Sequence, residues 1–135
     1  MGNIEVVPEK VAWVLVRDGR VLVTRNRGVD VFYFPGGKRE PGESDAETLA
    51  REIDEELQSR IDTTTMEHVG TFETQRDSDG RTEFRMICYT AAYSGPLAAS
   101  REIAESDWFG YGDRARVSAV DQMVFDALHT SGRLP

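Results

Sequence analysis

The sequence has very little cysteine and no long hydrophobic run. Cys88 is the only cysteine, so no disulfide can form within the chain, and neither a zinc cluster nor a redox pair is indicated. The apolar run 11–16 is far too short to span a bilayer, and the opening MGNIEVVPEK lacks the basic-then-apolar pattern of a secretory signal. We therefore expect a cytoplasmic protein with no membrane partner.

Positive charge is also scarce. The chain has 16 Lys and Arg against 24 Asp and Glu, which gives a formal net charge of −8 and a pI near 4.8. Proteins that bind nucleic acid polymers usually neutralise the phosphates with a basic surface. We therefore expect no nucleic acid polymer as partner, and a small phosphate ligand would need something other than net charge to hold it.

The length and apolar content are typical of one modest domain. The chain has 135 residues, of which 39% are hydrophobic, and this is enough for a single core. No repeat, low-complexity tract or linker-like run interrupts it. The sequence therefore predicts one domain over residues 1–135, either as a monomer or as a homodimer.

Several short runs predict β-strands. The apolar runs 11–16 and 21–24 flank Asp18-Gly19, a dipeptide typical of hairpin turns, so we expect these two runs to form an antiparallel pair. Further strands are predicted at 68–75, at 82–93 and around Trp108-Phe109.

Two helices are predicted. Ser44 and Glu47 have the spacing of a capping box, which satisfies two free amides at a helix start. A second amphipathic pattern begins near Val117 and ends near Gly132. The alternation of strands and helices indicates an α/β (α+β) fold with a mixed sheet and helices packed on it. The buried stripe of the first helix is predicted to be Ala46, Leu49, Ala50, Ile53 and Leu57.

The first of these helices carries a cluster of carboxylates. Glu52, Glu55 and Glu56 are three and four positions apart, so they project from one flank of the helix. Like charges at this spacing each destabilise a helix by a few tenths of a kcal/mol, about 0.2–0.5. Oxygen ligands without nearby His or Cys favour Mg²⁺ or Mn²⁺. The spacing is also compatible with an ordinary solvated acidic face.

The full pattern around this helix resembles a known motif. Gly37, five residues, Glu43, seven residues and then 51–56 (REIDEE) follow the spacing of the Nudix box. The chain therefore resembles the Nudix hydrolases. The resemblance implies a Nudix-type α/β/α sandwich, in which a mixed β-sheet lies between helices.

The sequence departs from the family pattern at the end of the box, which covers about residues 37–59. Gln58 and Ser59 stand where the family usually has a glycine and an apolar residue. Because glutamine tolerates a left-handed helix cap poorly, we expect the helix to end differently here. No charged position of the box is lost.

The resemblance implies a metal site. Carried over position by position, Glu52, Glu55 and Glu56 would bind one or more Mg²⁺ (or Mn²⁺), aided by a backbone carbonyl at Gly36 or Gly37. These are the expected metal ligands.

Other residues receive structural or catalytic roles from the resemblance. Arg51 and Glu43 would hold the loop against the helix through a charge pair, a structural role. Many members add a glutamate from a loop beyond the box, and Glu102 matches this role, with Glu105 as the alternative. Either Glu52 or Glu102 would take the proton of the attacking water.

Substrate-binding residues are harder to assign. Arg25 and Lys38 are the favoured cations for the outer phosphates. Phe34 is placed among the substrate-binding residues as an aromatic that stacks on a base, and a core position is its alternative. Tyr33 and Trp108 are further aromatics with both interpretations.

The resemblance implies hydrolysis of a nucleoside diphosphate linked to another group. The chain looks most like the MutT-type enzymes, which convert a nucleoside triphosphate, with an ordinary or an oxidised base, to the monophosphate and pyrophosphate. One alternative is a nucleotide-sugar, ADP-ribose or dinucleoside polyphosphate hydrolase. Another is a non-catalytic nucleotide sensor, although such a module is expected to lose a box glutamate.

Overall fold

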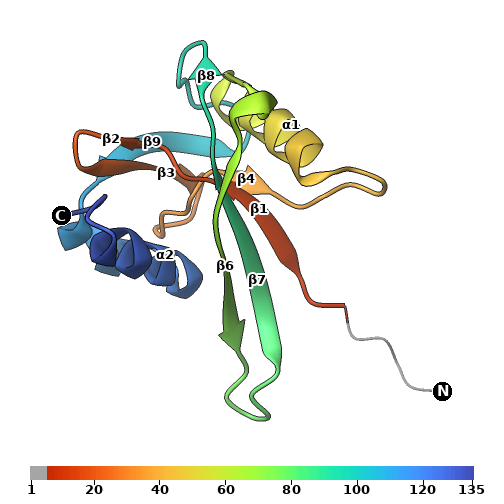
Figure 1. The fold of residues 1–135 in the computed structure, drawn as a ribbon, viewed down its shortest axis with the longest axis vertical. Helices are drawn as coiled ribbons and strands as arrows, with labels where there is room; N and C mark the ends of the chain where they lie inside the picture. Colours follow the sequence, from red (N-terminus) through yellow and green to blue (C-terminus); the bar gives the residue numbers. More distant parts are fainter. Residues whose placement is uncertain (1–5) are drawn as a thin grey trace.

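The structure is a computed structural model that describes residues 6–135. Residues 1–5, which are part of the N-terminal segment that lacks a secretory signal pattern, lie outside the described residues. Figure 1 shows the arrangement of its strands and helices. In chain order the elements are β1 (Glu9–Trp13), β2 (Val16–Arg17), β3 (Arg20–Asn26), β4 (Gly36–Gly37), α1 (Asp45–Leu57), β5 (Arg60–Ile61), η1 (Thr63–Thr65), β6 (Glu67–Gln75), β7 (Thr82–Thr90), β8 (Tyr93–Ser94), β9 (Ile103–Phe109), η2 (Tyr111–Arg116) and α2 (Ala119–Thr130).

The main sheet is mixed, as predicted. Its strand order is β4-β1-β7-β6, with β1 parallel to β7 and the other two pairs antiparallel. A second sheet has the order β2-β3-β9, and β5 pairs with β8. Val11 of β1 lies opposite Gly37 on one side and Ile87 on the other. The central strand therefore holds the glycine loop at the edge of the main sheet.

One face of the sheets is covered by α1. Successive residues of a strand point to opposite faces, and Val11 and Trp13 of β1 are in the core cluster of α1. Each fully buried Leu or Ile side chain stabilises the fold by about 1.5–3 kcal/mol. Of the predicted stripe, Leu49, Ile53 and Leu57 are fully buried, and Ala46 and Ala50 are partly buried.

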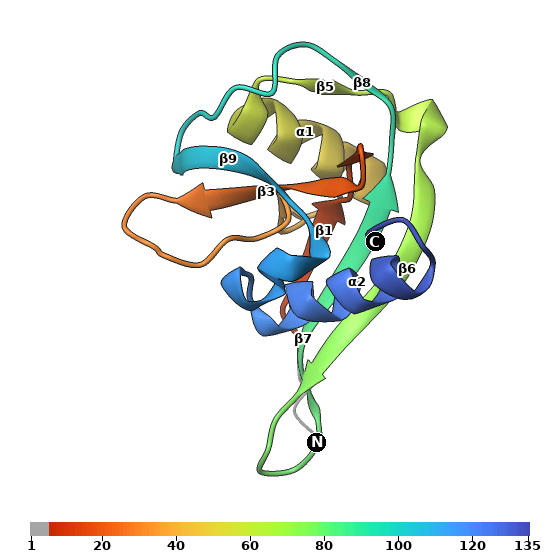
Figure 2. The same ribbon diagram turned by 90° about the vertical axis from the view of Figure 1, so that its left-hand side faces the viewer.

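The other face is covered by α2. Ala12 and Val14 belong to a second core cluster, together with the α2 residues Val124, Phe125 and Leu128. The two helices lie on opposite sides of the sheets, as the two perpendicular views show (Figures 1 and 2). The predicted α/β/α sandwich is therefore confirmed.

The predicted first hairpin is only partly right. β2 and β3 form an antiparallel pair, and Asp18 (φ 53°) and Gly19 (φ 73°) make the predicted turn. The run 11–16, however, is divided, because β1 pairs with β7 and β4 and only β2 pairs with β3. Pairing with a strand some seventy residues away thus overrides the local hairpin signal.

The start of α1 follows the predicted capping box. The Glu47 amide donates to Ser44 Oγ at 3.1 Å, and the Ser44 amide donates to Glu47 Oε1 at 3.0 Å. The predicted change at the other end is wrong, because Gln58 adopts the left-handed conformation (φ 56°, ψ 32°) that glycine would supply. Its side chain also donates to the Ala98 carbonyl at 3.4 Å, which ties the helix end to the following loop.

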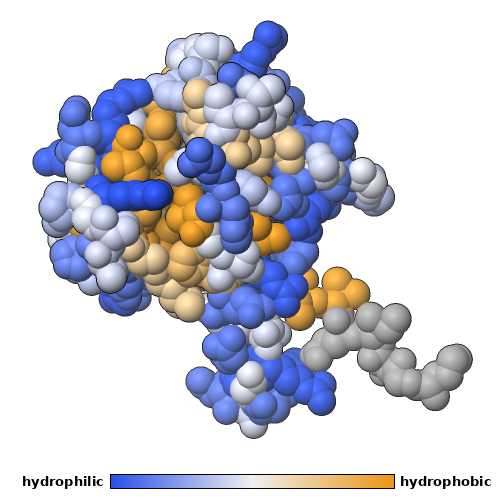
Figure 3. Space-filling view, viewed as in Figure 1, coloured by the Kyte–Doolittle hydropathy of each residue, from blue (hydrophilic) through white to orange (hydrophobic). Residues whose placement is uncertain are grey.

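The surface differs between the centre and the periphery. Hydrophobic residues gather in the middle of the face between α1 and α2, whereas the projecting β6–β7 hairpin is hydrophilic (Figure 3). No helix within residues 6–135 is long and apolar enough to cross a bilayer.

Candidate active site

The glycine loop requires both of its glycines, for different reasons. Gly36 has φ 144°, and a Cβ there would lie 2.0 Å from the Val11 carbonyl oxygen of β1. A Cβ on Gly37 would lie 2.3 Å from the carboxyl carbon of Glu52. The glycines thus let β1 and a helix carboxylate approach the loop backbone from two sides.

Arg51 fastens this loop to α1. Its Nε lies 2.8 Å from Glu43 Oε2, and its Nη2 lies 2.8 Å from Glu43 Oε1, a two-pronged ion pair. Nη2 also donates to the Lys38 carbonyl at 3.0 Å. The guanidinium lowers the pKa of Glu43 to about 2. This geometry is what the structural role predicted for Arg51 and Glu43 requires.

Arg51 also touches the carboxylate cluster. Its Nη1 lies 2.8 Å from Glu52 Oε1 and 3.7 Å from Glu55 Oε2. The like charges of this cluster are therefore partly neutralised from within the chain. The side-chain exposures, 15% for Glu52 and 33% for Glu55, place Glu55 nearer to solvent.

Glu56 is the most buried acid of the cluster. It is 3% exposed, and its Oε1 accepts a hydrogen bond from the Gly36 amide at 3.0 Å. Burial raises the pKa of Glu56 to about 8, against the opposing pull of the Lys10 charge. Burial also raises the pKa of Glu52. A buried carboxylate is unfavourable unless a cation or further donors accompany it, so Glu56 is held in place at a cost in stability.

Glu102, which lies far beyond the box in the sequence, is brought to the cavity that Glu56 lines. It precedes β9 and lines a cavity of about 240 Å³ together with Glu56. The loop before it is anchored on the last turn of α1, since the Ala98 amide donates to the Leu57 carbonyl and the Ser100 amide to the Glu56 carbonyl, both at 2.9 Å. The full lining is Lys10, Thr24, Asn26, Tyr33, Gly36, Glu56, Phe84 and Glu102.

The alternative glutamate is engaged elsewhere. The cavity lined by Glu56 and Glu102 is called the acidic cavity below. Glu105 forms an ion pair with Arg25 at 3.0 Å and does not line this cavity. Of the two loop glutamates, Glu102 is therefore the one placed beside the box.

The carboxylates do not converge on a metal position in this conformation. Among residues 6–135, no three His, Cys, Asp or Glu side chains lie close enough together to hold an ion. Glu52 is held by Arg51, and Glu56 by the Gly36 amide. The donor chemistry, carboxylate oxygens beside a glycine backbone, nonetheless fits a hard divalent cation. Such an ion would compete for these carboxylates with the hydrogen bonds they make now.

The predicted substrate residues have varied surroundings. Arg25 is paired with Glu105 and donates to the Val29 carbonyl at 3.0 Å, whereas the Lys38 side chain is exposed on the glycine loop. The assignment of Phe34 to base stacking is wrong in this structure, because its ring is 0% exposed and packs edge-on against Phe125 at a centroid distance of 5.7 Å. The alternative interpretation, a position in the hydrophobic core, agrees with this burial.

The other two aromatics also differ. Tyr33 is half-buried and lines the acidic cavity. Trp108 lies outside it, with the guanidinium of Arg17 4.9 Å from its ring centroid.

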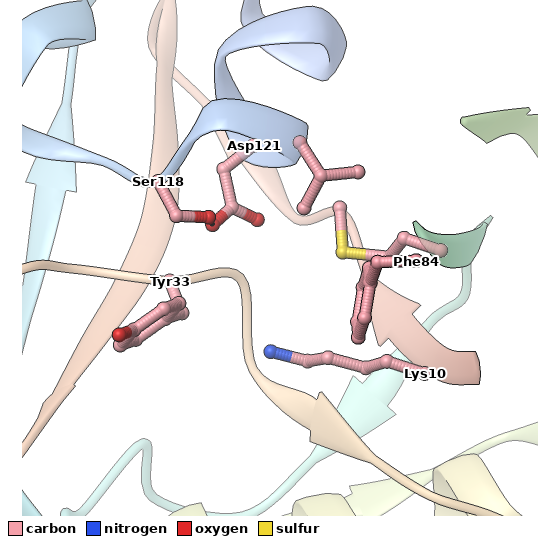
Figure 4. Close-up of a pocket in the computed structure, with 7 residues that line it drawn as sticks. Lys10, Tyr33, Phe84, Ser118 and Asp121 are labelled. Carbon is pink, nitrogen blue, oxygen red and sulfur yellow. Dashed lines mark hydrogen bonds between the residues drawn. The ribbon is translucent and has the colours of Figure 1, made fainter. Parts of the chain in front are cut away.

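A second cavity adjoins the acidic one and shares Lys10, Tyr33 and Phe84 with it. It has a volume of about 230 Å³ and is called the apolar cavity below (Figure 4). Its lining is Lys10, Tyr33, Phe84, Met86, Ser118, Val120 and Asp121.

The apolar cavity contains one buried acid. Asp121 is 1% exposed, its Oδ1 accepts from the Phe34 amide at 3.4 Å, and its Oδ2 accepts from the Ser118 hydroxyl at 2.5 Å. Burial raises the pKa of Asp121. Sequence reasoning missed this residue, since an aspartate in the first turn of a helix is ordinary. It also missed Lys10, which carries no motif and stands alone in a strand.

Comparison with known proteins agrees with this geometry. Residues 8–124 match the NUDIX domain family. The CTP pyrophosphohydrolase of Escherichia coli (strain K12) is 34% identical over 95 residues, which cover 67% of each chain. The solution structure of the E. coli ORF135 protein matches with a TM-score of 0.73 and 26% identity, over 96% of this chain and 94% of that one.

A second solved structure has the same fold at lower identity. The MutT NUDIX hydrolase from Burkholderia pseudomallei matches with a TM-score of 0.75 and 21% identity, over 92% of this chain and 99% of that one. The family match covers most of the chain, including the glycine loop, α1 and Glu102. The chain therefore belongs to the Nudix hydrolase family and is a Nudix pyrophosphohydrolase.

Proposed function

We propose that this protein hydrolyses a nucleoside triphosphate to the monophosphate and pyrophosphate with the help of Mg²⁺ or Mn²⁺. The observation that carries the proposal is the buried Glu56, which shares a cavity with Glu102 directly beside an apolar cavity of a size suited to a nucleobase. A relative at 34% identity is named a CTP pyrophosphohydrolase, which supports a nucleoside triphosphate as substrate.

The metal would be held by the Gly37 carbonyl and by Glu52, Glu55 and Glu56. Nudix hydrolases generally use divalent metals, and the all-oxygen donor set here suits one. When bound, such an ion neutralises phosphate charge and makes a water more acidic. Glu56 lines the acidic cavity, and an ion there would take the place of the Gly36 amide that its Oε1 now accepts from.

Two glutamates are candidates for the proton acceptor. Glu52 already accepts a hydrogen bond from Arg51 at 2.8 Å, so this carboxylate is engaged, although burial raises its pKa. Glu102 is exposed and lies in the wall of the acidic cavity. We therefore favour Glu102 as the residue that takes the proton of the attacking water, with Glu52 as a metal ligand.

The nucleoside would occupy the apolar cavity. Tyr33 and Phe84 supply aromatic surface there, and the buried carboxylate of Asp121 can accept a hydrogen bond from a base N–H. Lys38, which is exposed on the glycine loop, is the better placed of the two predicted cations for the outer phosphates, because Arg25 is already paired with Glu105.

The chain would act as one domain over residues 1–135, as a monomer or a homodimer, with a small nucleotide as its partner. A cytoplasmic location is consistent with its lone thiol, Cys88, which is free and buried.

The direct test is hydrolysis of a substrate panel with Mg²⁺, Mn²⁺ or EDTA by the wild type and by Glu56→Gln. The panel contains ordinary and oxidised nucleoside triphosphates, nucleotide sugars, ADP-ribose and dinucleoside polyphosphates. We expect metal-dependent release of pyrophosphate from a triphosphate, and its loss in the variant. Asp54→Asn is the matched control, because Asp54 is an exposed acid of the same helix that does not line the acidic cavity.

Other results would select an alternative. Cleavage confined to nucleotide sugars, ADP-ribose or dinucleoside polyphosphates would overturn the triphosphate assignment while keeping the metal site. Nucleotide binding without turnover under any metal would favour a sensor module.

A further inference from the structure

Lys10 occupies the junction of the two cavities. It is the one residue with a positive side chain that lines either cavity in the described part of the chain. Its ammonium points across the apolar cavity between Phe84 and Tyr33, with Asp121 on the opposite wall (Figure 4). The residue therefore combines a half-buried positive charge with direct access to the space where a nucleoside would lie.

The ammonium has unused donor capacity. One of its three N–H groups donates to the Phe34 carbonyl, with an Nζ–O distance of 2.6 Å. Its charge acts on Asp121 and on Glu56, but no salt bridge to either forms within the described residues. The Nζ also lies 5.5 Å from the centroid of the Tyr33 ring. Two donors are therefore left for a ligand that enters beside Tyr33.

We propose that Lys10 donates a hydrogen bond to a carbonyl oxygen of the nucleotide base, and that it thereby selects cytosine, uracil and guanine over adenine. This inference rests on the proposed function, because it assumes that the apolar cavity receives the base.

The selection follows from the chemistry of the two polar groups. The three favoured bases each carry a ring carbonyl, an oxygen acceptor suited to a compact, strongly hydrated ammonium. Asp121, on the opposite wall, can accept from an N–H of the same base. Adenine has no carbonyl: its acceptors are ring nitrogens, and it carries an amino donor where guanine carries its carbonyl, so the ammonium would gain no oxygen partner from the base beyond the Phe34 carbonyl it already has. Sites built around a buried polar group discriminate strongly against ligands that leave it unpaired.

The test is steady-state kinetics of the wild type and of Lys10→Met with CTP, UTP, GTP and ATP. The wild type is expected to prefer the first three over ATP. In the variant, kcat/KM for the preferred substrates is expected to fall about 10- to 100-fold, the value of a hydrogen bond to a charged group. The loss is expected mainly in KM, and it should be clearly smaller for ATP, so the preference narrows.

Two further variants separate binding from structure. Lys10→Arg keeps a cationic donor and is expected to restore part of the preference. Arg60→Met removes a positive charge from β5, outside both cavities, and should leave the order of substrates unchanged. A wild type that uses ATP as well as the others, or an equal loss of all four substrates in Lys10→Met, would overturn the inference.

A binding experiment keeps this inference separate from the proposed function. CMP and AMP are titrated calorimetrically into the wild type and Lys10→Met in EDTA, where no turnover occurs. A preference for CMP that the variant loses supports Lys10 as a base-reading residue even if no triphosphate is hydrolysed. Equal affinities of the wild type for CMP and AMP would refute it even if triphosphates are cleaved.

Discussion

The acidic cavity and the apolar cavity lie side by side but are built in different ways. The carboxylates of the Nudix box, of which Glu56 lines the acidic cavity, come from one helix, and Arg51 and the glycine loop, within twenty residues of it, hold Glu52 and Glu56. The walls of the apolar cavity come from β1, β7, the start of α2 and the segment that contains Tyr33. The box carboxylates thus have a compact local framework suited to reaction chemistry, whereas the apolar cavity depends on how distant elements pack.

This difference separates two kinds of mutational effect. Changes in the box carboxylates, in the glycine loop or in Glu102 should reduce turnover for every substrate, because they affect groups that act on phosphates. Changes in the apolar cavity should alter affinity, base preference or stability. Matched pairs of variants test this division.

The largest expected effect is the difference in kcat between substitutions of the two loop glutamates, Glu102 and Glu105. Glu102→Gln should reduce kcat by roughly 10²- to 10⁴-fold, the usual contribution of a general base. Glu105→Gln should change kcat little, because Glu105 forms only a partly exposed ion pair with Arg25, worth about 0–1 kcal/mol. The measurement is kcat of both variants by steady-state kinetics. Equal decreases in kcat would contradict the assignment of Glu102 as the proton acceptor.

Adjacent glycines should give opposite outcomes. Gly36→Ala places a Cβ 2.0 Å from a backbone oxygen of β1 at φ 144°, so a loss of unfolding free energy of about 3 kcal/mol or more is expected. Gly37→Ala meets only the carboxylate end of the Glu52 side chain, which can swing away more cheaply than backbone, so it should lower activity with a smaller loss of stability. Chemical denaturation and kinetics on the same samples check both. Comparable stability losses would argue against this distinction.

A smaller effect is expected for Arg51→Lys. Lysine keeps the charge but cannot reproduce the paired contacts to Glu43 or reach Lys38 and Glu52 at once. Activity should fall about 10- to 100-fold, as is common when a residue that orients metal ligands is changed. The apparent Mg²⁺ requirement should rise in parallel, whereas the relative order of bases should stay the same. A changed base preference would contradict the separation of the two cavities.

The smallest effect is expected for Asp121→Asn, in the apolar cavity. Burial raises the pKa of Asp121, so the folded protein retains a proton that the unfolded chain has already lost. The stability from this group is complete below the unfolded pKa and is lost as pH rises through the folded pKa. The wild type should therefore lose melting temperature relative to Asp121→Asn as pH rises above the ordinary pKa of an aspartate, about 4. A pH-independent difference between their melting curves would contradict this.

The local part of the site was largely predictable. The capping box of Ser44 and Glu47, the Arg51–Glu43 pair and the position of Glu102 beside the box all follow patterns written in the sequence. The first two depend on helical spacing or on a motif of fixed length, so distant contacts change them little. Glu102 was predicted from the family resemblance, and the loop anchored on the end of α1 brings it beside the box.

The errors concern burial and long-range pairing. Phe34 is an aromatic residue of the kind that can stack on a base, but α2 covers it. Only its contact with Phe125 in the folded protein shows that it belongs to the core. Gln58 takes a left-handed cap that its type disfavours, because the loop at Ala98 closes on the helix end. Lys10 and Asp121 lie more than one hundred residues apart, so no spacing rule connects them.

By itself the sequence determined the family, the α1 helix and the common flank of Glu52, Glu55 and Glu56, because a helix repeats every 3.6 residues whatever surrounds it. The tertiary structure decided that Glu56 is buried, that Arg51 partly neutralises Glu52, and that Lys10 faces Asp121 across a cavity. The physical reason is that burial and cavities arise from the parallel pairing of β1 with β7 and from the packing of α2, which bring together residues that are distant in the chain.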